Sequence, residues 1–224
     1  MKGSPQYAVF DAYGTLLDVH SAIARHAGRV GPAAAAVSAL WRQKQLEASW
    51  VLSAAGDYED FWAVTERALD FALATQGIAD PSLRLDLLEA YRSLDAYRDA
   101  APMLAALRGR GFGCGVLSNG EPGMLAAGVA SAGLEPLLDV VLSAHVLRRY
   151  KPNAGVYRLA TEHFDAQPHE VAFVSSNAWD AYGAARFGFR AFWINRAGAP
   201  VEYWLDRLAT ILPDLAALPE ALGA

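Results

Sequence analysis

The stretch YAVFDAYGTLLD, residues 7–18, contains the features that decide the fold. Its apolar run, Tyr7–Phe10, has the length of a buried strand and is followed by Asp11. Gly14 and Thr15 come next, and glycine beside small polar residues is typical of a turn. The stretch therefore predicts a strand that delivers Asp11 into a tight turn. In open parallel sheets, ligands bind at that end of the strands.

Four further apolar runs have the length and composition of buried strands. They are Gly113–Leu117, Val140–Ser143, Val171–Val174 and Ala191–Ile194. Segments with helical spacing separate or precede them: Ala101–Arg110, Pro122–Ala132, Asn153–Phe164 and Ala178–Phe187. Strands that alternate with helices predict an α/β fold with a Rossmann-like, doubly wound parallel sheet.

The region between about Asp18 and Asp95 interrupts this alternation because it is helical throughout. Apolar residues recur there at helical intervals in three segments: Ala33–Leu52, Tyr58–Thr75 and Ser82–Leu94. We interpret the region as an all-helical cap subdomain inserted after the first strand. The predicted domains are a catalytic core, residues 1–17 and 96–224, and a cap, residues 18–95.

Composition restricts the class of protein. The chain has 224 residues, is 54% hydrophobic and carries a formal charge of −5, which argues against a sequence-independent nucleic-acid binder. The single cysteine, Cys114, excludes an intrachain disulfide. No long uncharged apolar run suggests a membrane span, and the first residues lack the pattern of a signal peptide. We expect a cytoplasmic protein that binds neither nucleic acid nor membranes.

Polar residues follow the predicted strands and should meet at one edge of the sheet. Each has an ordinary explanation when taken alone. Asp11 can be a turn aspartate, Ser118–Gly120 a plain turn and Lys151 a solvated loop lysine. Ser175–Asn177 can cap a helix whose dipole Asp180 then favours. Four such coincidences, each beyond a buried strand, explain the pattern less well than one site does. The candidate site residues are Asp11, Thr15, Ser118, Asn119, Lys151, Ser175, Asn177 and Asp180.

Together these loops resemble the haloacid dehalogenase superfamily, which combines an aspartate nucleophile, a Ser/Thr loop, a lysine and a final acidic loop. The phosphatase branch reads Asp-x-Asp-Gly-Thr first and Gly-Asp-x-x-x-Asp last. It holds magnesium with the first aspartate and the acids of the last loop, and its second acid serves as general acid–base. In this chain Tyr13 replaces the second acid and Ser176 replaces the first acid of the final loop. The resemblance therefore implies an enzyme without a metal or another cofactor.

Within the superfamily, six motifs resemble the (S)-2-haloacid dehalogenases, also called L-2-haloacid dehalogenases. They are FDAYGTLLDVHS (10–21), LWRQKQLEASW (40–50), LSNG (117–120), YKP (150–152), VSSNAWDAYGA (174–184) and WINRAG (193–198). The resemblance covers nearly the whole chain. It implies metal-independent hydrolysis of short 2-haloacids to 2-hydroxyacids through an aspartyl ester, with inversion at the α-carbon.

The resemblance also assigns roles to residues. Asp11 would attack the α-carbon, Lys151 would keep Asp11 ionised, and Asp180 would hold or deprotonate the hydrolytic water. Arg42 would receive the halide. A halide leaves without a proton, which explains why Tyr13 can replace an acid. Further catalytic residues would be Thr15, Ser175 and Asn177, and the substrate would contact Tyr13, Ser118, Asn119, Gln43, Leu46, Phe61, Tyr157 and Trp179.

Two other functions remain open from the sequence. One is a magnesium-dependent phosphatase of the same superfamily acting on a small phosphate ester, and the other is a non-catalytic protein that binds small carboxylates. Turnover of fluoroacetate is a further possibility that the sequence leaves undecided. The expected partners are a 2-haloacid, the halide ion and a second copy of the chain. We also expect Arg42 and Phe61 to face Asp11 across one cleft between cap and core.

Overall fold

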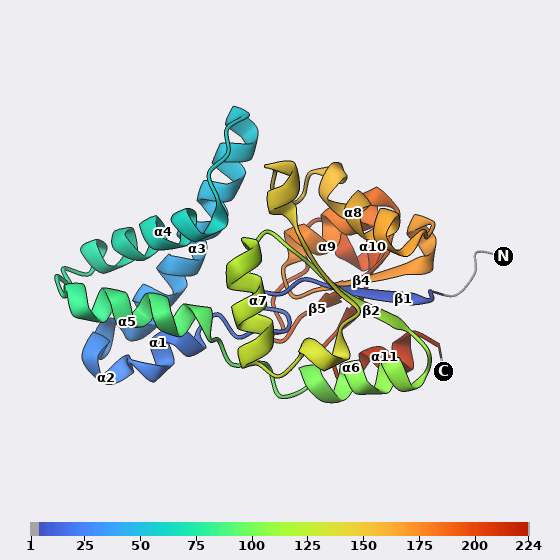
Figure 1. Cartoon of the computed structure of the whole chain (residues 1–224), viewed down its shortest axis with the longest axis horizontal. Coiled ribbons are helices and arrows are strands. Elements are labelled where there is room, and N and C mark those ends of the chain that lie inside the picture. The colour runs from blue at the N-terminus through green and yellow to red at the C-terminus, as the bar shows by residue number, and fades with distance from the viewer. Residues whose placement is uncertain (1–4, 224) are drawn as a thin grey trace.

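The computed structural model describes residues 5–223, so the first four residues of the predicted core and Ala224 lie outside it (Figure 1). Its strands form one parallel sheet in the order β3-β2-β1-β4-β5-β6. The strands are β1 (Tyr7–Phe10), β2 (Gly113–Ser118), β3 (Val140–Ser143), β4 (Val171–Ser175), β5 (Arg190–Ile194) and β6 (Ala209–Leu212). This topology confirms the predicted α/β, Rossmann-like fold.

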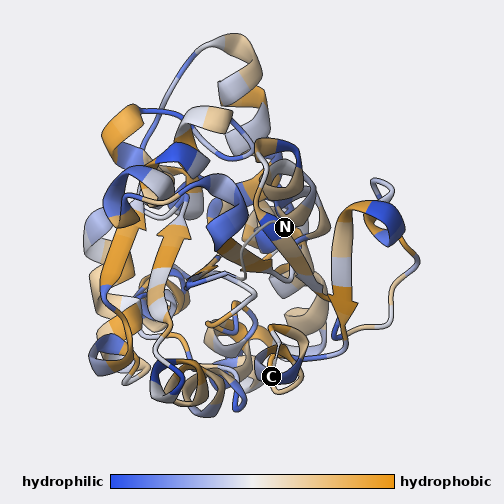
Figure 2. Ribbon diagram, turned by 90° about the vertical axis from the view of Figure 1, so that its right-hand side faces the viewer, coloured by the Kyte–Doolittle hydropathy of each residue, from blue (hydrophilic) through white to orange (hydrophobic). Residues whose placement is uncertain are grey.

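Helices cover both faces of the sheet, and the alternation of side chains along β1 shows how. Ala8 and Phe10 belong to the buried cluster that includes α6 (Ala100–Gly109), α7 (Pro122–Ser131) and α11 (Leu218–Ala221). Val9 belongs to the cluster on the opposite face, with α8 (Ala154–Phe164) and α9 (Ala178–Phe187). Figure 2 shows the strands mostly in the colour of hydrophobic residues, as expected for a sheet buried on both faces.

Three elements at the end of the chain were not predicted, namely β6, the short helix α10 (Leu205–Leu208) and α11. β6 pairs only with β5, and its Ile211 is 36% exposed. An edge strand is buried less than an inner one, so its sequence lacks the continuous apolar run that identified the others. Short 3-10 helices complete the chain: η1 (Gly31–Ala33), η2 (Glu135–Leu137), η3 (Ala144–Leu147) and η4 (Pro168–Glu170).

The segment between β1 and α6 is helical, as predicted, and lies to one side of the sheet (Figure 1). Its ends follow local rules. The Asp60 and Asp80 side chains cap the helices that follow them, and Gly56 ends the longest helix at a positive φ of 72°. The helices are α1 (Ser21–Arg25), α2 (Ala27–Val30), α3 (Ala34–Ala55), α4 (Phe61–Thr75) and α5 (Pro81–Arg92).

The chain enters and leaves the helical segment through two neighbouring stretches. The Asp18 N–H donates to the Asp95 carbonyl at 2.8 Å, and the Tyr97 N–H donates to the Leu16 carbonyl at 2.9 Å. We propose this crossing as the boundary between a core, residues 1–17 and 96–224, and a cap, residues 18–95. One buried hydrophobic cluster nevertheless continues from Phe10 to Trp41 of the cap, so the two parts pack directly on each other.

Within residues 5–223, no helix combines the length and the apolar composition that crossing a membrane would require.

Candidate active site

Asp11 lies at the carboxyl end of β1, where the strand order changes direction. β1 pairs with β2 on one side and with β4 on the other, and the Asp11 N–H extends the second pairing by donating to the Val174 carbonyl at 2.9 Å. The turn then closes through Gly14, whose φ is +90°, and its N–H donates to the Leu17 carbonyl at 2.7 Å. Only 6% of Asp11 is exposed. The sheet therefore holds this carboxylate at the position where such folds bind ligands.

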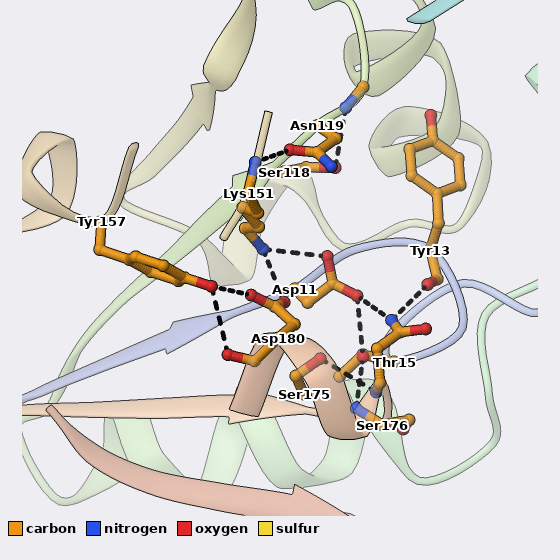
Figure 3. Close-up of polar contacts among 12 residues, drawn as sticks. Asp11, Tyr13, Thr15, Ser118, Asn119, Lys151, Tyr157, Ser175, Ser176 and Asp180 are labelled. Carbon is orange, nitrogen blue, oxygen red and sulfur yellow. Dashed lines mark hydrogen bonds and ion pairs between the residues drawn. The ribbon is translucent and has the colours of Figure 1, made fainter. Parts of the chain in front are cut away.

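Lys151 joins two carboxylates in the buried centre of the site (Figure 3). Its Nζ donates to Asp11 Oδ1 at 3.2 Å and to Asp180 Oδ2 at 2.9 Å, and the side chain is 0% exposed. Burial alone would lower the pKa of Lys151, but the two carboxylates outweigh it, so this pKa is raised. The lysine stays protonated and supports a negative charge on its partners.

Asp180, in the first turn of α9, is held between Lys151 and Tyr157. Tyr157 donates its hydroxyl to Asp180 Oδ1 at 2.8 Å, and Asp180 is 0% exposed. Burial raises the pKa of Asp180 to about 6, although the Lys151 charge acts in the opposite direction. Burial and the neighbouring Asp180 raise the pKa of Tyr157 well above its usual value, so its hydroxyl remains a donor. Asp180 is thus a carboxylate whose ionisation changes close to neutral pH.

The second oxygen of Asp11 accepts from two neutral donors. Thr15 Oγ1 lies 3.2 Å and Asn177 Nδ2 lies 2.7 Å from Asp11 Oδ2. The Ser176 N–H donates to Thr15 Oγ1 at 2.9 Å, which directs the threonine hydroxyl proton toward Asp11. The two oxygens of Asp11 therefore have different surroundings, one beside an ammonium and the other beside a hydroxyl and an amide.

Arg42 extends from α3 to the catalytic turn, residues 11–17, which follows β1. Its guanidinium donates to the Tyr13 carbonyl at 3.0 Å and to Asn177 Oδ1 at 3.3 Å. Both acceptors are neutral, and among residues 5–223 no carboxylate forms an ion pair with Arg42. Arg42 does not lie on an outer, solvated face of the helix. The Arg42 side chain is half-buried and, within the described part of the chain, forms no ion pair. Asn177, which accepts from the guanidinium, also donates to Asp11.

Backbone N–H groups orient the polar side chains at the ends of β2 and β4. Ser118 Oγ accepts from the Gly120 N–H at 3.1 Å, and Ser175 Oγ accepts from the Asn177 N–H at 3.1 Å. Each serine keeps its hydroxyl proton for another acceptor. Asn119 Oδ1 accepts from the Lys151 N–H at 2.8 Å and so ties the β2 loop to the loop that carries the lysine.

Tyr13 occupies the second position after Asp11, and its ring is turned away from the Asp11–Lys151–Asp180 group in Figure 3. Its hydroxyl is buried without a hydrogen-bond partner. Burial, followed by the neighbouring Tyr91, raises the pKa of Tyr13 well above its usual value. The residue is therefore neutral and does not supply the negative charge of a carboxylate.

The substrate-contact residues predicted on the cap are only partly brought to this site. Phe61 is 2% exposed, and its ring centroid lies 6.4 Å from that of Tyr13. Leu46 is half-buried, one helical turn beyond Arg42. Gln43, in contrast, is exposed and donates to Glu47 of its own helix at 2.5 Å, so the structure does not bring it to the site. Neighbouring positions on a helix point in different directions, which separates Gln43 from Arg42.

Trp179 is partly exposed at the edge of the site. Its ring meets Trp50 of α3 edge-on with a centroid distance of 5.5 Å. The two tryptophans, with Tyr150 and Tyr203, line a cavity of about 540 Å³ between α3 and the start of α9.

No group of three or more His, Cys, Asp and Glu side chains within residues 5–223 is arranged to hold a metal ion. The position between Asp11 and Asp180 contains the Lys151 ammonium. A second positive charge placed there would be repelled.

Comparison with known proteins identifies the family. The model of the haloacid dehalogenase-like hydrolases matches residues 6–188 of this chain. The chain belongs to this family. (S)-2-haloacid dehalogenase 4A of Burkholderia cepacia is 48% identical over 204 residues, which cover 91% of this chain and 88% of that protein.

Solved structures of family members agree with the fold in detail. A dehalogenase with an intermediate complex superposes with a TM-score of 0.96 at 45% identity, covering 99% of this chain and 98% of the other. The L-2-haloacid dehalogenase from Xanthobacter autotrophicus with chloropropionic acid covalently bound has a TM-score of 0.88 at 36% identity, covering 97% of this chain and 98% of that one.

Two glycines shape the site although the sequence analysis did not single them out. A Cβ on Gly183 would overlap the Tyr157 hydroxyl and lie 2.7 Å from Pro152 Cβ. A Cβ on Gly120 would lie 2.8 Å from Cε2 of Tyr13. Both glycines belong to the family motifs, and their presence there was the available signal. Glycine weakens helices, so its occurrence inside α9 is a second signal that could have identified a close contact at Gly183.

Proposed function

We propose that the protein is an (S)-2-haloacid dehalogenase, which hydrolyses short 2-haloacids to 2-hydroxyacids through an ester on Asp11 with inversion at the α-carbon. One observation carries the proposal: the buried Lys151 ammonium lies 3.2 Å from Asp11 and 2.9 Å from Asp180. The position two residues after the nucleophile is a neutral tyrosine, Tyr13. The similarity to (S)-2-haloacid dehalogenases over most of the chain supports the same activity.

In the first step, Asp11 attacks the α-carbon through Oδ1. This oxygen accepts a hydrogen bond only from Lys151, whereas Thr15 and Asn177 both donate to Oδ2. Attack opposite the halogen forms the carbon–oxygen bond and expels halide with the electron pair of the broken bond. Halide is a stable anion that needs no proton, so the site needs no second acid at Tyr13.

Arg42 receives the departing halide. Its charge is half-buried, and its acceptors near Asp11 are a carbonyl and an amide oxygen rather than a carboxylate. A cation in such surroundings attracts an anion more strongly than one in water does. Negative charge develops on the halogen as the bond breaks, so Arg42 stabilises the transition state more than the bound substrate.

The substrate carboxylate binds at the end of β2. Ser118 accepts a hydrogen bond from the Gly120 N–H and keeps its own proton to donate. Neighbouring backbone amides add further donors, since a turn after a parallel strand leaves N–H groups free to bind anions.

In the second step, water hydrolyses the ester at its carbonyl carbon. Asp11 Oδ2 becomes the carbonyl oxygen, and its donors Thr15 and Asn177 stabilise the oxyanion that develops there. Asp180 takes the proton of the attacking water, because a pKa of about 6 leaves it mostly ionised at neutral pH but still basic. The Ser175 hydroxyl helps to order this water. The bond between the Asp11 carboxyl carbon and Oδ1 then breaks. The proton passes to the departing alkoxide oxygen, with Lys151 between Asp180 Oδ2 and Asp11 Oδ1 as the relay, and the regenerated Asp11 carboxyl releases its remaining proton to water.

Halide release tests the proposed activity against the alternatives. The substrates are fluoroacetate, chloroacetate, bromoacetate and both enantiomers of 2-chloropropionate, each with and without a chelator. We expect chelator-resistant halide release, with (S)-2-chloropropionate converted to (R)-lactate and no turnover by Asp11→Asn. Hydrolysis of nitrophenyl phosphate that requires magnesium, without halide release, would indicate a phosphatase. Binding of haloacetate without any turnover would indicate a binding protein.

We further propose a cytoplasmic homodimer. The α3–α4 face of the cap exposes Val51 by 66% and Phe71 by 50%, and a shallow apolar hollow of about 420 Å³ lies between them. Lys44, Glu47 and Arg67 border this hollow, so charges of both signs could pair across a two-fold axis. Light scattering that gives a monomer at working concentration would contradict the dimer.

A further inference from the structure

Three polar side chains lie buried inside the cap, and the proposed reaction uses none of them. Gln45 on α3 and Thr65 on α4 are 0% exposed, and Tyr91 on α5 is 2% exposed. Burying an amide or a hydroxyl without a hydrogen-bond partner is strongly unfavourable. Side chains of this kind persist in a core only when they are hydrogen-bonded.

The hydrogen bonds of these residues form one continuous chain across three helices. The Tyr91 hydroxyl donates to Gln45 Oε1 at 3.2 Å, and Gln45 Nε2 donates to Thr65 Oγ1 at 2.9 Å. The Thr65 hydroxyl then donates to the Phe61 carbonyl at 2.7 Å. Trp41 Nε1 joins the same turn of α4 by donating to the Thr65 carbonyl at 2.9 Å. The positions of α3, α4 and α5 relative to one another are therefore linked by directional contacts.

Both ends of this hydrogen-bonded network lie near Tyr13 of the catalytic turn. The Tyr91 ring stacks on the Tyr13 ring at a centroid distance of 5.7 Å and an angle of 13°. At the other end, the Phe61 ring centroid lies 6.4 Å from that of Tyr13. Burial raises the pKa of Tyr91, and the charge of Arg42 is near enough to oppose this effect. The network and Arg42 thus share the same surroundings.

Stability alone does not require these polar groups. A paired hydrogen bond adds little net stability, and apolar groups of the same shape can replace both partners at little cost. Apolar groups cannot replace the fixed orientation that these hydrogen bonds impose on the three helices. Hydrophobic contacts are non-directional, whereas hydrogen bonds require a defined geometry.

The position of the Arg42 guanidinium depends on the orientation of α3. Arg42 precedes Gln45 by three residues, so both side chains leave α3 on neighbouring parts of its surface. Its own acceptors are neutral and hold it weakly. Side chains extend about 5–6 Å from a helix axis, so a rotation of about 10° would move the guanidinium by about 1 Å. A displacement of that size in a catalytic group can cost about 100-fold in rate.

We propose that Gln45, Thr65 and Tyr91 are positioning residues that fix the rotation of α3 and so hold the Arg42 guanidinium at the catalytic turn. The inference rests on the proposed function, in which Arg42 receives the halide. The three residues touch no reacting atom. Gln45 and Thr65 act through the helix that carries Arg42, and the Tyr91 hydroxyl also lies close to the guanidinium itself.

The test replaces the whole polar chain by apolar groups of similar shape in the variant Gln45→Leu/Thr65→Val/Tyr91→Phe. Halide release is measured in single turnovers, with enzyme in excess, from chloroacetate and from bromoacetate. We expect release from chloroacetate to slow about 10- to 100-fold. The loss should be smaller for bromoacetate, since the better leaving group depends less on Arg42. The urea midpoint of unfolding should stay equal to that of the wild type or rise.

Two control variants keep the interpretation specific. Ser49→Ala removes a fully buried hydroxyl of the same helix that bonds only to the Leu46 carbonyl, at 2.8 Å, and it should change neither the rates nor their ratio. Arg42→Ala should show the same dependence on the halide as the triple variant, to a larger extent.

Three outcomes overturn the inference. In the first, the triple variant keeps both rates. In the second, it loses both in equal proportion, as a merely less stable cap would. In the third, Arg42→Ala shows no dependence on the halide, which also removes the assigned role of Arg42. Absence of halide release from the wild-type protein would instead refute the proposed function itself.

Discussion

Replacing Tyr157 by phenylalanine should make hydrolysis of the ester intermediate require a higher pH. Asp180 must be ionised to accept the proton of water, and its rate contribution falls as the pH drops through its pKa. The Tyr157 hydroxyl donates to Asp180 Oδ1 at 2.8 Å and lowers that pKa, because a donor favours the charged form of an acceptor. Removing the hydroxyl therefore raises the pKa and leaves less base at a given pH.

The size of the shift follows from the hydrogen bond that is lost. A hydrogen bond to a charged group contributes about 1.5–3 kcal/mol, and one pKa unit corresponds to about 1.4 kcal/mol. The acidic limb of the pH–rate profile for ester hydrolysis should therefore move to higher pH by about 1–2 units. In the resting site the pKa of Asp180 is about 6. The negative charge of Asp11 contributes to this raised value. In the ester intermediate Asp11 is neutral, so the pKa of Asp180 is lower there. The acidic limb of wild-type ester hydrolysis should therefore lie at a somewhat lower pH.

The assay follows decay of the esterified Asp11 peptide by rapid quench and mass spectrometry between pH 4.5 and 9, for wild type and variant. Tyr150→Phe provides a matched control, because it removes a tyrosine hydroxyl that bonds to the Glu59 carbonyl and not to Asp180. An acidic limb at the same pH, with the same rates in all three proteins, would show that the Tyr157–Asp180 hydrogen bond does not control the group that titrates. A slower rate at every pH without a shift would give Tyr157 a purely structural role.

Three further predictions concern the same site. Gly183→Ala should displace the Tyr157 hydroxyl and destabilise the protein by about 1–3 kcal/mol in urea unfolding, and its acidic limb should move upward as well; an unchanged limb would contradict the contact. Lys151→Ala should slow ester formation for every substrate, whereas Arg42→Ala should affect fluoroacetate more than bromoacetate, and equal proportional losses in halide-release rates would reject these separate roles. A single turnover in heavy-oxygen water with excess enzyme should label Asp11 and not the product hydroxyl, as read by mass spectrometry; an unlabelled Asp11 after complete turnover would rule out the ester.

The sequence predicted the architecture well because the relevant information is local. Continuous apolar runs such as Val171–Val174 identify strands buried on both faces, and α9 has the bounds that its glycine stop predicted. β6 was missed for the corresponding reason, since an edge strand with an exposed Ile211 lacks that signal.

The candidate site was predictable to the extent that the topology itself brings its residues together. Loops that follow parallel strands share one edge of the sheet, so Asp11, Lys151 and Asp180 could be grouped before any contact was known. The residues on the cap had no such rule. Arg42 was distinguished from an ordinary exposed arginine only by the family motif, and Gln43, drawn from the same motif, lies exposed in the structure.

The sequence by itself determined the order of strands and helices, the inserted helical segment and the chemical types at the sheet edge, because each depends on short-range periodicity. Only the tertiary structure decided which partners these groups have. The Tyr157 hydroxyl reaches Asp180 because α8 packs on α9 at Gly183, and the Gln45 amide is satisfied because α4 and α5 enclose it. Such contacts join residues far apart in the chain, and their geometry depends on how whole helices pack, which no local pattern encodes.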